Sequence, residues 1–313
     1  MYYNEENREL WKNVIQRVAE ESGKNEKMIE KDIVQSLFLE KLSQTDLPFV
    51  FKGGTSLSKC YGVIDRFSED IDISMSVKPT ESQRKRSKRE ILCIAGEIGL
   101  TLDEQQCKVY SNHDYNEYVF LYESIFGGQV RTLVETNYYL TVYPVHKQPI
   151  HNILLDFCKD RGINLPEGLY VPEFSMAVQD IQRTFIDKVF ALCDYSIQGL
   201  TERNSRHLYD LYQMMPYIQF DDEFLSLIDA VRQDRMKSKN NPSAQPEYDI
   251  SAMLQEIIDT GLFKDDYNHI TTPLLYQPVS YETVKDNLQD IVDSRMFDSF
   301  ENEKESEPEP LLI

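Results

Sequence analysis

The sequence has no long apolar run, and this limits the classes of protein to which it can belong. No stretch of about 18 consecutive apolar residues occurs, so a membrane-spanning helix is not expected. The first ten residues, MYYNEENREL, lack the basic and apolar regions of a secretory signal peptide. With 41% apolar and 27% charged residues in a chain of 313, the composition predicts a globular cytoplasmic protein with no membrane partner.

Cysteine is also scarce, and its spacing argues against two kinds of cross-link. A disulfide framework or a structural zinc site would need paired or clustered cysteines. The five cysteines are scattered, without C-x-x-C spacing or a nearby histidine pattern: Cys60, Cys93, Cys107, Cys158 and Cys193. We therefore expect all five to be reduced and most of them to be buried.

Positive charge is the third deficit. The formal net charge of −20 comes from 33 lysines and arginines against 53 acidic residues. It argues against a general nucleic-acid binder, because non-specific affinity comes from cations that neutralise phosphates. The end of the chain contributes to the excess, since residues 301–309 hold five glutamates and one lysine, or −4. We expect this acidic tail, residues 301–313, to be disordered.

Two segments are nevertheless basic. Residues 84–89, RKRSKR, contain five cations in six positions, and residues 232–239, RQDRMKSK, contain four. For the first segment, a solvated helix face and a contact with RNA phosphates or an acidic partner are equally open. The second segment is a further candidate RNA contact. The charge distribution therefore keeps an RNA partner possible despite the overall acidity.

The stretch 51–74, FKGGTSLSKCYGVIDRFSEDIDIS, begins with a glycine turn. Gly53 and Gly54 would let the backbone approach a phosphate closely. Thr55 and Ser56 can open a helix whose free N–H groups attract anions. A glycine pair followed by hydroxyl residues is by itself more typical of an ordinary turn and helix cap.

Two carboxylates follow in the same stretch. If residues 70–73 form a strand, Asp70 and Asp72 share one face while Ile71 and Ile73 enter a core on the other. Two such carboxylates repel each other unless a cation lies between them, and hard oxygen ligands suit Mg²⁺. An Asp-x-Asp alone is usually solvated. In this order and spacing, the turn and the carboxylates together predict a phosphate and metal site.

The order of residues in this stretch resembles a known sequence signature. A G-[GS] turn followed by D-x-D is similar to the signature of the nucleotidyltransferase superfamily. KGGTSLSK followed by RFSEDIDIS more closely resembles the AbiEii/AbiGii-type toxins of bacterial toxin–antitoxin and abortive-infection systems. The resemblance implies an enzyme that transfers a nucleoside monophosphate from a nucleoside triphosphate, in several members onto the 3′ end of tRNA. It also implies restraint by a cognate antitoxin.

The superfamily usually places a third carboxylate on a strand beside the D-x-D strand. Residues 117–124 and 129–143 alternate in polarity on either side of a Phe-Gly-Gly turn, so they are predicted to form an antiparallel hairpin. Glu135, in the second strand, is the candidate third metal ligand. The alternative, an outward-facing strand glutamate without a role, stays open.

Two later segments resemble further family motifs. TFIDKVFAL is similar to the T-x-x-x-K motif, whose lysine contacts the nucleotide phosphates, and this implies that role for Lys188. RHLYDLY resembles a segment whose final aspartate is catalytically required, which implies that role for Asp210. Arg206 would bind phosphate or stabilise Asp210. His207 departs from the family pattern, which often has an aspartate there. Without the resemblance, Lys188 and Asp210 would be interpreted as helix-surface residues.

Other charged residues near the glycine motif are predicted to be exposed. Glu30-Lys31-Asp32, within a predicted helix at 26–42, resembles an EKD element common in the toxin family. A solvated helix face is favoured over a direct part in catalysis. Lys52, Lys59 and Arg66 are candidate contacts for triphosphate or RNA, but each is more simply explained as a surface cation.

The patterns predict an α/β (α+β) fold. A nucleotidyltransferase domain with a small mixed sheet flanked by helices, residues 1–165, would precede a helical domain, residues 166–300, that closes the active-site cleft. The boundary follows the irregular, proline-bearing region at 144–172. Strands are expected at 48–52 and 70–73 besides the hairpin. The predicted helices span residues 5–22, 26–42, 80–100, 176–193, 203–215, 223–235, 250–262 and 281–300.

The expected reaction is two-metal phosphoryl transfer onto an acceptor hydroxyl. Mg²⁺ and a nucleoside triphosphate are the expected cofactor and substrate, tRNA is the expected acceptor, and an antitoxin is the expected partner. Nucleotidylation of a protein and a catalytically silent nucleotide-binding module are the alternatives. The residues expected to act are Asp70, Asp72 and Glu135 on metal, Gly53, Gly54, Thr55, Ser56 and Arg206 on nucleotide, and Lys188 and Asp210 in catalysis.

Overall fold

In a computed structural model the described residues are 2–110 and 112–298. The predicted acidic tail, residues 301–313, lies outside them. Contacts divide the chain into two compact units, Met1–Asp180 and Ile181–Ile313. The division falls after residue 165 because strand β8 pairs with β1 and β7 in the first unit. Residues 166–180, predicted to begin the helical domain, therefore belong to the first unit. None of the described helices is long and apolar enough to cross a membrane.

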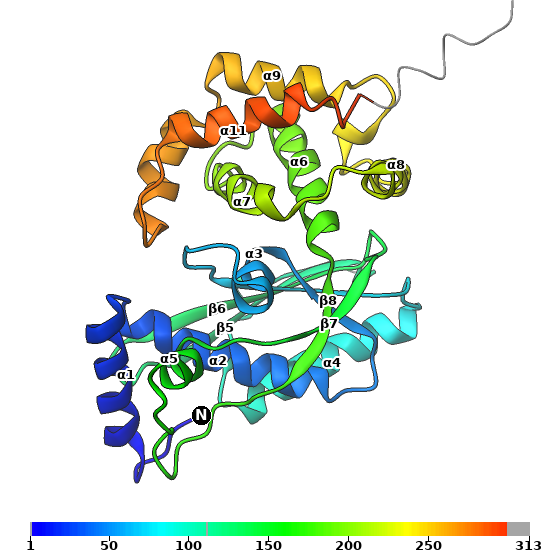
Figure 1. The fold of residues 1–313 in the computed structure, drawn as a ribbon. Coiled ribbons are helices and arrows are strands. Elements are labelled where there is room, and N and C mark those ends of the chain that lie inside the picture. The colour runs from blue at the N-terminus through cyan, green and yellow to red at the C-terminus, as the bar shows by residue number, and fades with distance from the viewer. Residues whose placement is uncertain (1, 111, 299–313) are drawn as a thin grey trace, which may run out of the picture. The chain divides into compact units, whose positions relative to one another are not determined.

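The first unit is built on an eight-stranded mixed sheet (Figure 1), in the order β3-β5-β6-β2-β1-β8-β7 with β4 on β5. β2 is antiparallel to β1 and parallel to β6, while β8 is parallel to β1. The mixed α/β architecture confirms the predicted fold class. The strands are β1 (Phe49–Lys52), β2 (Asp70–Met75), β3 (Thr101–Leu102), β4 (Lys108–Val109), β5 (Tyr115–Glu123), β6 (Gln129–Asn137), β7 (Val145–Pro149) and β8 (Ser175–Gln179).

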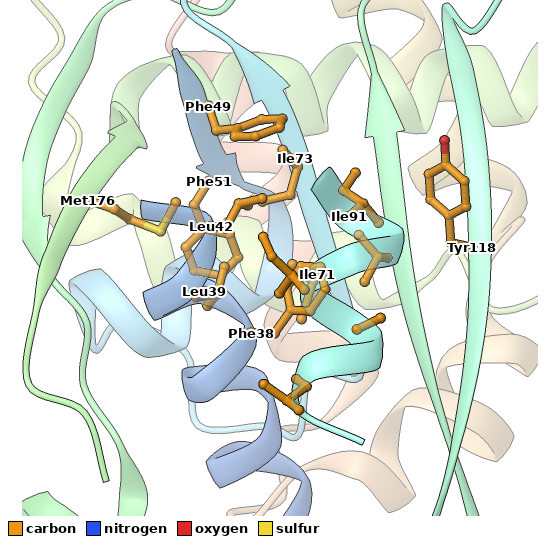
Figure 2. Close-up of a cluster of buried hydrophobic side chains, with 14 of the residues drawn as sticks. Phe38, Leu39, Leu42, Phe49, Phe51, Ile71, Ile73, Ile91, Tyr118 and Met176 are labelled. Atoms are coloured by element: carbon orange, nitrogen blue, oxygen red, sulfur yellow. The ribbon is translucent and has the colours of Figure 1, made fainter. Parts of the chain in front are cut away.

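Helices α2 and α4 lie against one face of this sheet (Figure 1), where alternate strand residues are apolar. Phe51 and Ile71 are fully buried there, and Figure 2 shows them gathered beside Phe38, Leu39 and Leu42 of α2. The alternate positions of β1 and β2 nearest the glycine turn, Lys52, Asp70 and Asp72, point to the other face. The helices of this unit are α1 (Arg8–Ser22), α2 (Glu26–Ser43), α3 (Gly53–Ser56) with the π-helix Leu57–Tyr61, α4 (Glu81–Glu97) and α5 (Ile153–Arg161).

Several local predictions can be compared with these elements. The hairpin is confirmed, because β5 and β6 pair antiparallel along their whole length. The strands predicted at 48–52 and 70–73 are β1 and β2. The prediction of one helix over 176–193 is wrong at its start, because residues 175–179 form β8 and pair with β7. β7 lies within the proline-bearing region 144–172, and β8 begins just after it.

The second unit is helical. α6 contacts α7, α8 and α9, and α11 packs on α7 and α9. Phe185, Val189 and Leu192 of α6 are fully buried, as the predicted apolar stripe requires. Its helices are α6 (Ile181–Gln198), α7 (Arg206–Met214), α8 (Asp222–Arg235), α9 (Ile250–Thr260), α10 (Lys264–Asp266) and α11 (Tyr281–Asp293), with short π and 3₁₀ segments at Met215–Tyr217, Pro242–Ala244, Tyr267–Thr271 and Thr272–Leu274.

The Glu30-Lys31-Asp32 triplet of α2 is buried, so the prediction of a solvated helix face is wrong. Glu30 is 0% exposed and accepts hydrogen bonds from the Tyr2 hydroxyl at 3.0 Å, Ser124 Oγ at 2.6 Å and the Ile125 amide at 2.9 Å. These bonds fasten the helix to the N-terminal segment and to the β5–β6 turn. The charge is retained in the interior because each carboxylate oxygen is bonded.

Lys59 and Asp32 form a buried ion pair that joins three segments, so the prediction that Lys59 is a surface cation is also wrong. Lys59 Nζ lies 2.5 Å from Asp32 Oδ1 and is 2.9 Å from Ser36 Oγ and 3.3 Å from the carbonyl of His151. The lysine is 3% exposed. Through these contacts Lys59 ties the π-helix to α2 and to the chain before α5.

Replacing Lys59 with methionine should destabilise the first unit by about 3–5 kcal/mol, because it leaves the Asp32 carboxylate buried without its counter-charge. Urea unfolding followed by the fluorescence of Trp11, the single tryptophan and fully buried in this unit, measures the change. The matched control is Lys41→Met, which breaks the exposed pair with Glu97 and should cost about 1 kcal/mol or less. Equal unfolding midpoints for the two variants would contradict the assignment.

Candidate active site

A row of charged residues crosses the polar face of the sheet. Strand register pairs Lys52 with Asp72, Asp72 with Glu135, and Glu135 with Glu117. Paired residues point to the same face, so Asp72 and Glu135 are lateral neighbours, and Asp70, two positions earlier in β2, points to the same face. Glu135 thus lies on a strand beside the D-x-D strand, as predicted, and its function as a metal ligand stays a prediction.

Repulsion between Asp72 and Glu135 is visible in the acidity of Glu135. Burial and the Asp72 carboxylate raise the pKa of Glu135 to about 7, while Lys52 and a hydrogen bond from Tyr115 act in the opposite direction. The Tyr115 hydroxyl also donates to Glu117 Oε1 at 2.9 Å. The face therefore presents an excess of negative charge that one lysine does not balance.

Tyr115 and Glu117 are site neighbours that the sequence reasoning missed. One pattern in the sequence could have identified both residues. If the hairpin pairs Glu135 with Glu117, the alternation of side chains along the first strand puts Tyr115 and Glu117 on the same face as Glu135. That pairing depends on where the hairpin turns, and the Phe-Gly-Gly turn left several registers possible.

The glycine turn lies directly against Asp72. Gly53 has φ = 76°, and a Cβ there would stand 1.9 Å from Asp72 Oδ2. A Cβ on Gly54 would stand 2.8 Å from Arg66 Nη2. Position 53 therefore needs glycine both for backbone conformation and for space, whereas a side chain at position 54 would have to displace the end of the Arg66 side chain. The predicted phosphate turn and the predicted metal carboxylate are brought together.

The hydroxyls after the turn are engaged within the chain. Thr55 Oγ1 lies 2.8 Å from Ser68 Oγ and also bonds the carbonyl of Asp70, and Ser56 Oγ donates to the carbonyl of Gly53 at 2.8 Å. Both residues are buried. In this conformation they shape the turn and fasten it to β2. Their predicted contact with phosphate stays a prediction.

Arg66 is buried, not a surface cation as predicted. It is 4% exposed, and its Nη1 donates to the carbonyl of Phe67 at 3.2 Å. Its guanidinium faces Gly54, as the short Nη2 distance above shows. A cation therefore stands beside the glycine turn, on the chain segment that leads to Asp70.

The second unit brings Lys188 and Asp210 into contact. Lys188 Nζ lies 2.7 Å from Asp210 Oδ2, and their side chains are 7% and 0% exposed. His207 Nδ1 is 3.5 Å from the same ammonium, and its ring packs on Tyr195 with centroids 5.6 Å apart. Without the family resemblance, both charged residues were predicted to lie on a helix surface. Their burial shows that this prediction is wrong. His207, which departs from the family pattern, therefore lies next to Lys188.

The segment before α7 is held by Asp266. Its two carboxylate oxygens accept from the amides of Arg203 at 2.8 Å and Ser205 at 3.1 Å. This fixes the start of α7 and with it the helix that carries Asp210 and Arg206. Arg206 is partly exposed, and its nucleotide contact stays a prediction.

Two of the four cations in the segment 232–239, predicted as a further candidate RNA contact, are buried and so are not available to RNA. Arg232 and Arg235 are 4% and 5% exposed. Arg232 donates to backbone carbonyls of residues 244, 245 and 248, while Arg235 pairs with Asp187 and with Asp194 at 2.7 Å. Lys237 and Lys239 are its exposed cations. The arginines instead hold α8 to α6 and the following loop.

Comparison with solved structures assigns the class of fold. MenT4, a nucleotidyltransferase toxin from Mycobacterium tuberculosis H37Rv, is similar with a TM-score of 0.51 and 18% sequence identity, over 90% of this chain and 88% of that one. At this identity the likeness shows a nucleotidyltransferase-toxin fold. No curated protein matched the sequence.

The family follows from a sequence model. The model described as "Nucleotidyl transferase AbiEii toxin, Type IV TA system" matches residues 37–294, most of the chain. The protein belongs to this family and is a nucleotidyltransferase toxin of a type IV toxin–antitoxin system. Family membership implies a nucleoside triphosphate substrate and an antitoxin partner. It confirms the resemblance inferred from the glycine turn and the D-x-D pair.

The residues on the sheet face fit a divalent cation in donor type. Asp70, Asp72 and Glu135 offer carboxylate oxygens, the ligands preferred by hard cations, and the pKa of Glu135 is raised first by burial and then by the charge of Asp72. Among the described residues, no three acidic, histidine or cysteine side chains already converge as a metal-binding group. Asp72 and Glu135 would hold the ion, with Asp70 as the further ligand.

Glu135→Gln should stabilise the metal-free protein at alkaline pH. Because the pKa of Glu135 is higher in the folded protein than its ordinary value of 4.5, ionisation opposes folding, and this cost is complete above about pH 7 and lost toward pH 4.5. We expect a gain of roughly 1–3 kcal/mol near pH 8 that shrinks as the pH falls. Urea unfolding in EDTA measures it.

The control is Glu123→Gln, at the exposed end of β5, which should change stability little at any pH. Adding Mg²⁺ should raise the unfolding midpoint of the wild type more than that of Glu135→Gln, because the ion binds the folded state through this carboxylate. Parallel pH profiles for wild type and Glu135→Gln would show that Glu135 is not strained by its neighbour.

Proposed function

We propose that the protein is a Mg²⁺-dependent nucleotidyltransferase that transfers a nucleoside monophosphate from a nucleoside triphosphate to the 3′ end of tRNA. The observation that carries the proposal is the placement of Asp72, which adjoins Glu135 on the neighbouring strand β6 and the Gly53 turn at the end of the neighbouring strand β1. A carboxylate between a second carboxylate and a glycine turn is suited to hold a cation against phosphate oxygens.

The sheet residues would bind the nucleotide's phosphates and the cation. Bound there, Mg²⁺ would neutralise phosphate charge and increase the acidity of the attacking hydroxyl. Gly53 and Gly54, having no side chain, leave the backbone N–H groups of the turn open to a phosphate. Since the Thr55 and Ser56 hydroxyls already have partners within the chain, we assign the first phosphate contacts to the backbone. The hydroxyls would support the turn and exchange partners when nucleotide binds.

Lys188, Asp210 and Arg206 would act from the second unit. Asp210 holds the ammonium of Lys188 at 2.7 Å, which fixes its position and keeps it charged despite burial. A positioned cation stabilises charge that develops on the transferred phosphoryl group. Arg206 would add a second cation for the phosphates, because its planar guanidinium suits phosphate oxygens.

The most direct test incubates the purified protein with total RNA and each labelled nucleoside triphosphate in turn. We expect label in the tRNA band with one or more nucleotides. Asp72→Asn should lower the rate by at least about 10²–10³-fold, because a principal electrostatic element is removed. Asp160→Asn, an exposed residue at the end of α5, is the control and should retain full activity.

Three outcomes would change the proposal. Label on a protein band instead of RNA would make protein nucleotidylation the activity. No label with any nucleotide, together with no Mg²⁺-dependent nucleotide binding by calorimetry, would identify a silent binding module. Full activity in Asp72→Asn would remove the sheet carboxylates from the mechanism.

A further inference from the structure

A hollow of about 580 Å³ lies beside the N-terminal half of α4 in the first unit. Its walls are formed by Glu81, Ser82, Lys85, Lys88, Arg89 and His113. The lining has three cations and one anion, which is a net charge of +2 when His113 is counted as neutral. The protein has a net charge of −20, so its solubility does not require clustered cations at this place.

The cations of this hollow are not all neutralised by the protein. Lys85 pairs with Glu81 at 2.6 Å. Lys88 and Arg89, by contrast, form no ion pair or hydrogen bond with another described residue. Elsewhere on α4, Arg84 is paired with Asp114 and Arg86 with Asp46 and Glu90. The basic segment 84–89 thus divides into cations that hold the fold together and two that remain available to a ligand.

A buried nitrogen in the same wall also lacks a partner. His113 Nδ1 is shielded from solvent and has no hydrogen-bond partner among the described residues, although burying such a group unsatisfied is costly. His113 also holds a left-handed backbone conformation, with φ = 56°, which is uncommon for a residue with a side chain. A donor of this kind beside two free cations fits an anion with several acceptor oxygens.

Two exposed tyrosines belong to chain segments that are hydrogen-bonded to residues 113 and 114, at the wall of the hollow. Tyr110, whose carbonyl accepts from the His113 amide at 2.9 Å, is 50% exposed. Tyr139 is 38% exposed and follows Tyr138, whose amide donates to the carbonyl of Asp114 at 2.7 Å. Aromatic faces beside cations are typical of single-stranded nucleic-acid sites, where bases stack while phosphates pair. An acidic peptide would use the cations and leave the tyrosines without a function.

The hollow is connected to the carboxylates of the active face. Tyr110 packs edge-on against Tyr115 with centroids 5.8 Å apart, and the Tyr115 hydroxyl bonds Glu117, the strand partner of Glu135. Along β6, Glu135 is three residues from Tyr138, about 10 Å at the rise of a strand. About three stacked nucleotides span that distance.

We propose that Lys88, Arg89 and His113 form a phosphate-binding site for the single-stranded part of the RNA acceptor, with Tyr110 and Tyr139 as stacking surfaces on its way from the active face. The inference rests on the proposed RNA acceptor and names where this RNA is held. The site is separate from the triphosphate turn, so its loss affects the acceptor and not the nucleotide.

The test measures binding of a fluorescein-labelled single-stranded RNA to the full chain by anisotropy, at several salt concentrations and without nucleotide. The double variant Lys88→Ala/Arg89→Ala should bind about tenfold more weakly, and its slope of log affinity against log salt should fall by about 1.4, or 0.7 for each lost phosphate contact. His113→Ala and Tyr110→Ala should each weaken binding at all salt concentrations, and Tyr110→Ala should leave the slope unchanged.

The matched control is Lys237→Ala/Lys239→Ala, which removes the same charge from exposed positions of the segment 232–239 and should bind RNA within about twofold of wild type. The fluorescence of Trp11 reports whether each variant is folded. Nucleotide affinity, measured by calorimetry, should be equal in all variants.

The outcomes separate this site from the proposed function. If wild type labels RNA but Lys88→Ala/Arg89→Ala keeps its RNA affinity and salt slope, the site is wrong and the function stands. If the double variant loses RNA affinity while wild type labels no RNA, the site stands and the proposed acceptor is wrong. Binding of polyglutamate, but not RNA, through Lys88 and Arg89 would overturn the assignment in favour of an acidic partner.

Discussion

The register between β2 and β6 is the constraint on which the active face depends. It sets Asp72 beside Glu135, two like charges that a sheet without a function would keep apart. The same alternation turns Ile71 and Ile73 into the core under α2 and α4. A slip of one residue would bury the carboxylates and expose the isoleucines, so the apolar packing holds the strand in the register that keeps the repulsive pair. Core stability therefore offsets the electrostatic cost of the site.

Buried charge on α2 extends this dependence to the segments around the glycine turn. Asp32 anchors Lys59, which follows the turn, and Glu30 anchors the β5–β6 turn. Gln35, on the same helix, donates to the carbonyl of Glu69 at 3.1 Å, next to Asp70. One helix thus positions the chain on both sides of β2. A buried ion pair is weak evidence for stability, but it is well suited to fix position, because its geometry cannot relax without leaving a charge unsatisfied.

The sequence was informative where local chemistry determines structure. Glycine spacing, strand alternation and helical periodicity identified β1, β2, the β5–β6 hairpin and most helices, and the face of Asp70 and Asp72 followed from a period of two. It was less informative for long-range pairing. β8 joins β1 across more than a hundred residues, and nothing near Met176 distinguishes a strand from the start of the helix that follows.

Charged residues gave the least reliable local predictions. Glu30, Lys59, Arg66, Arg232 and Arg235 are polar in the sequence and buried in the fold. Glu30, Lys59 and Arg235 are retained in the interior by partners more than 25 residues away along the chain. Hydropathy describes the free-energy cost of burying a charge but does not identify the partner whose interaction offsets that cost. That partner is known only once the tertiary contacts are.

The environment of Lys188 shows how such a partner can be exchanged without losing the site. Family members often carry an aspartate where this chain has His207, and a second acid would add a second negative charge beside the ammonium. An imidazole nitrogen can accept from an ammonium without a charge of its own. At 3.5 Å from Nζ, His207 can help orient Lys188 while Asp210 remains its counter-charge in this pair of helices. The lysine then has less of its charge neutralised by acids, so the departure from the family pattern is compatible with the electrostatic role proposed for Lys188.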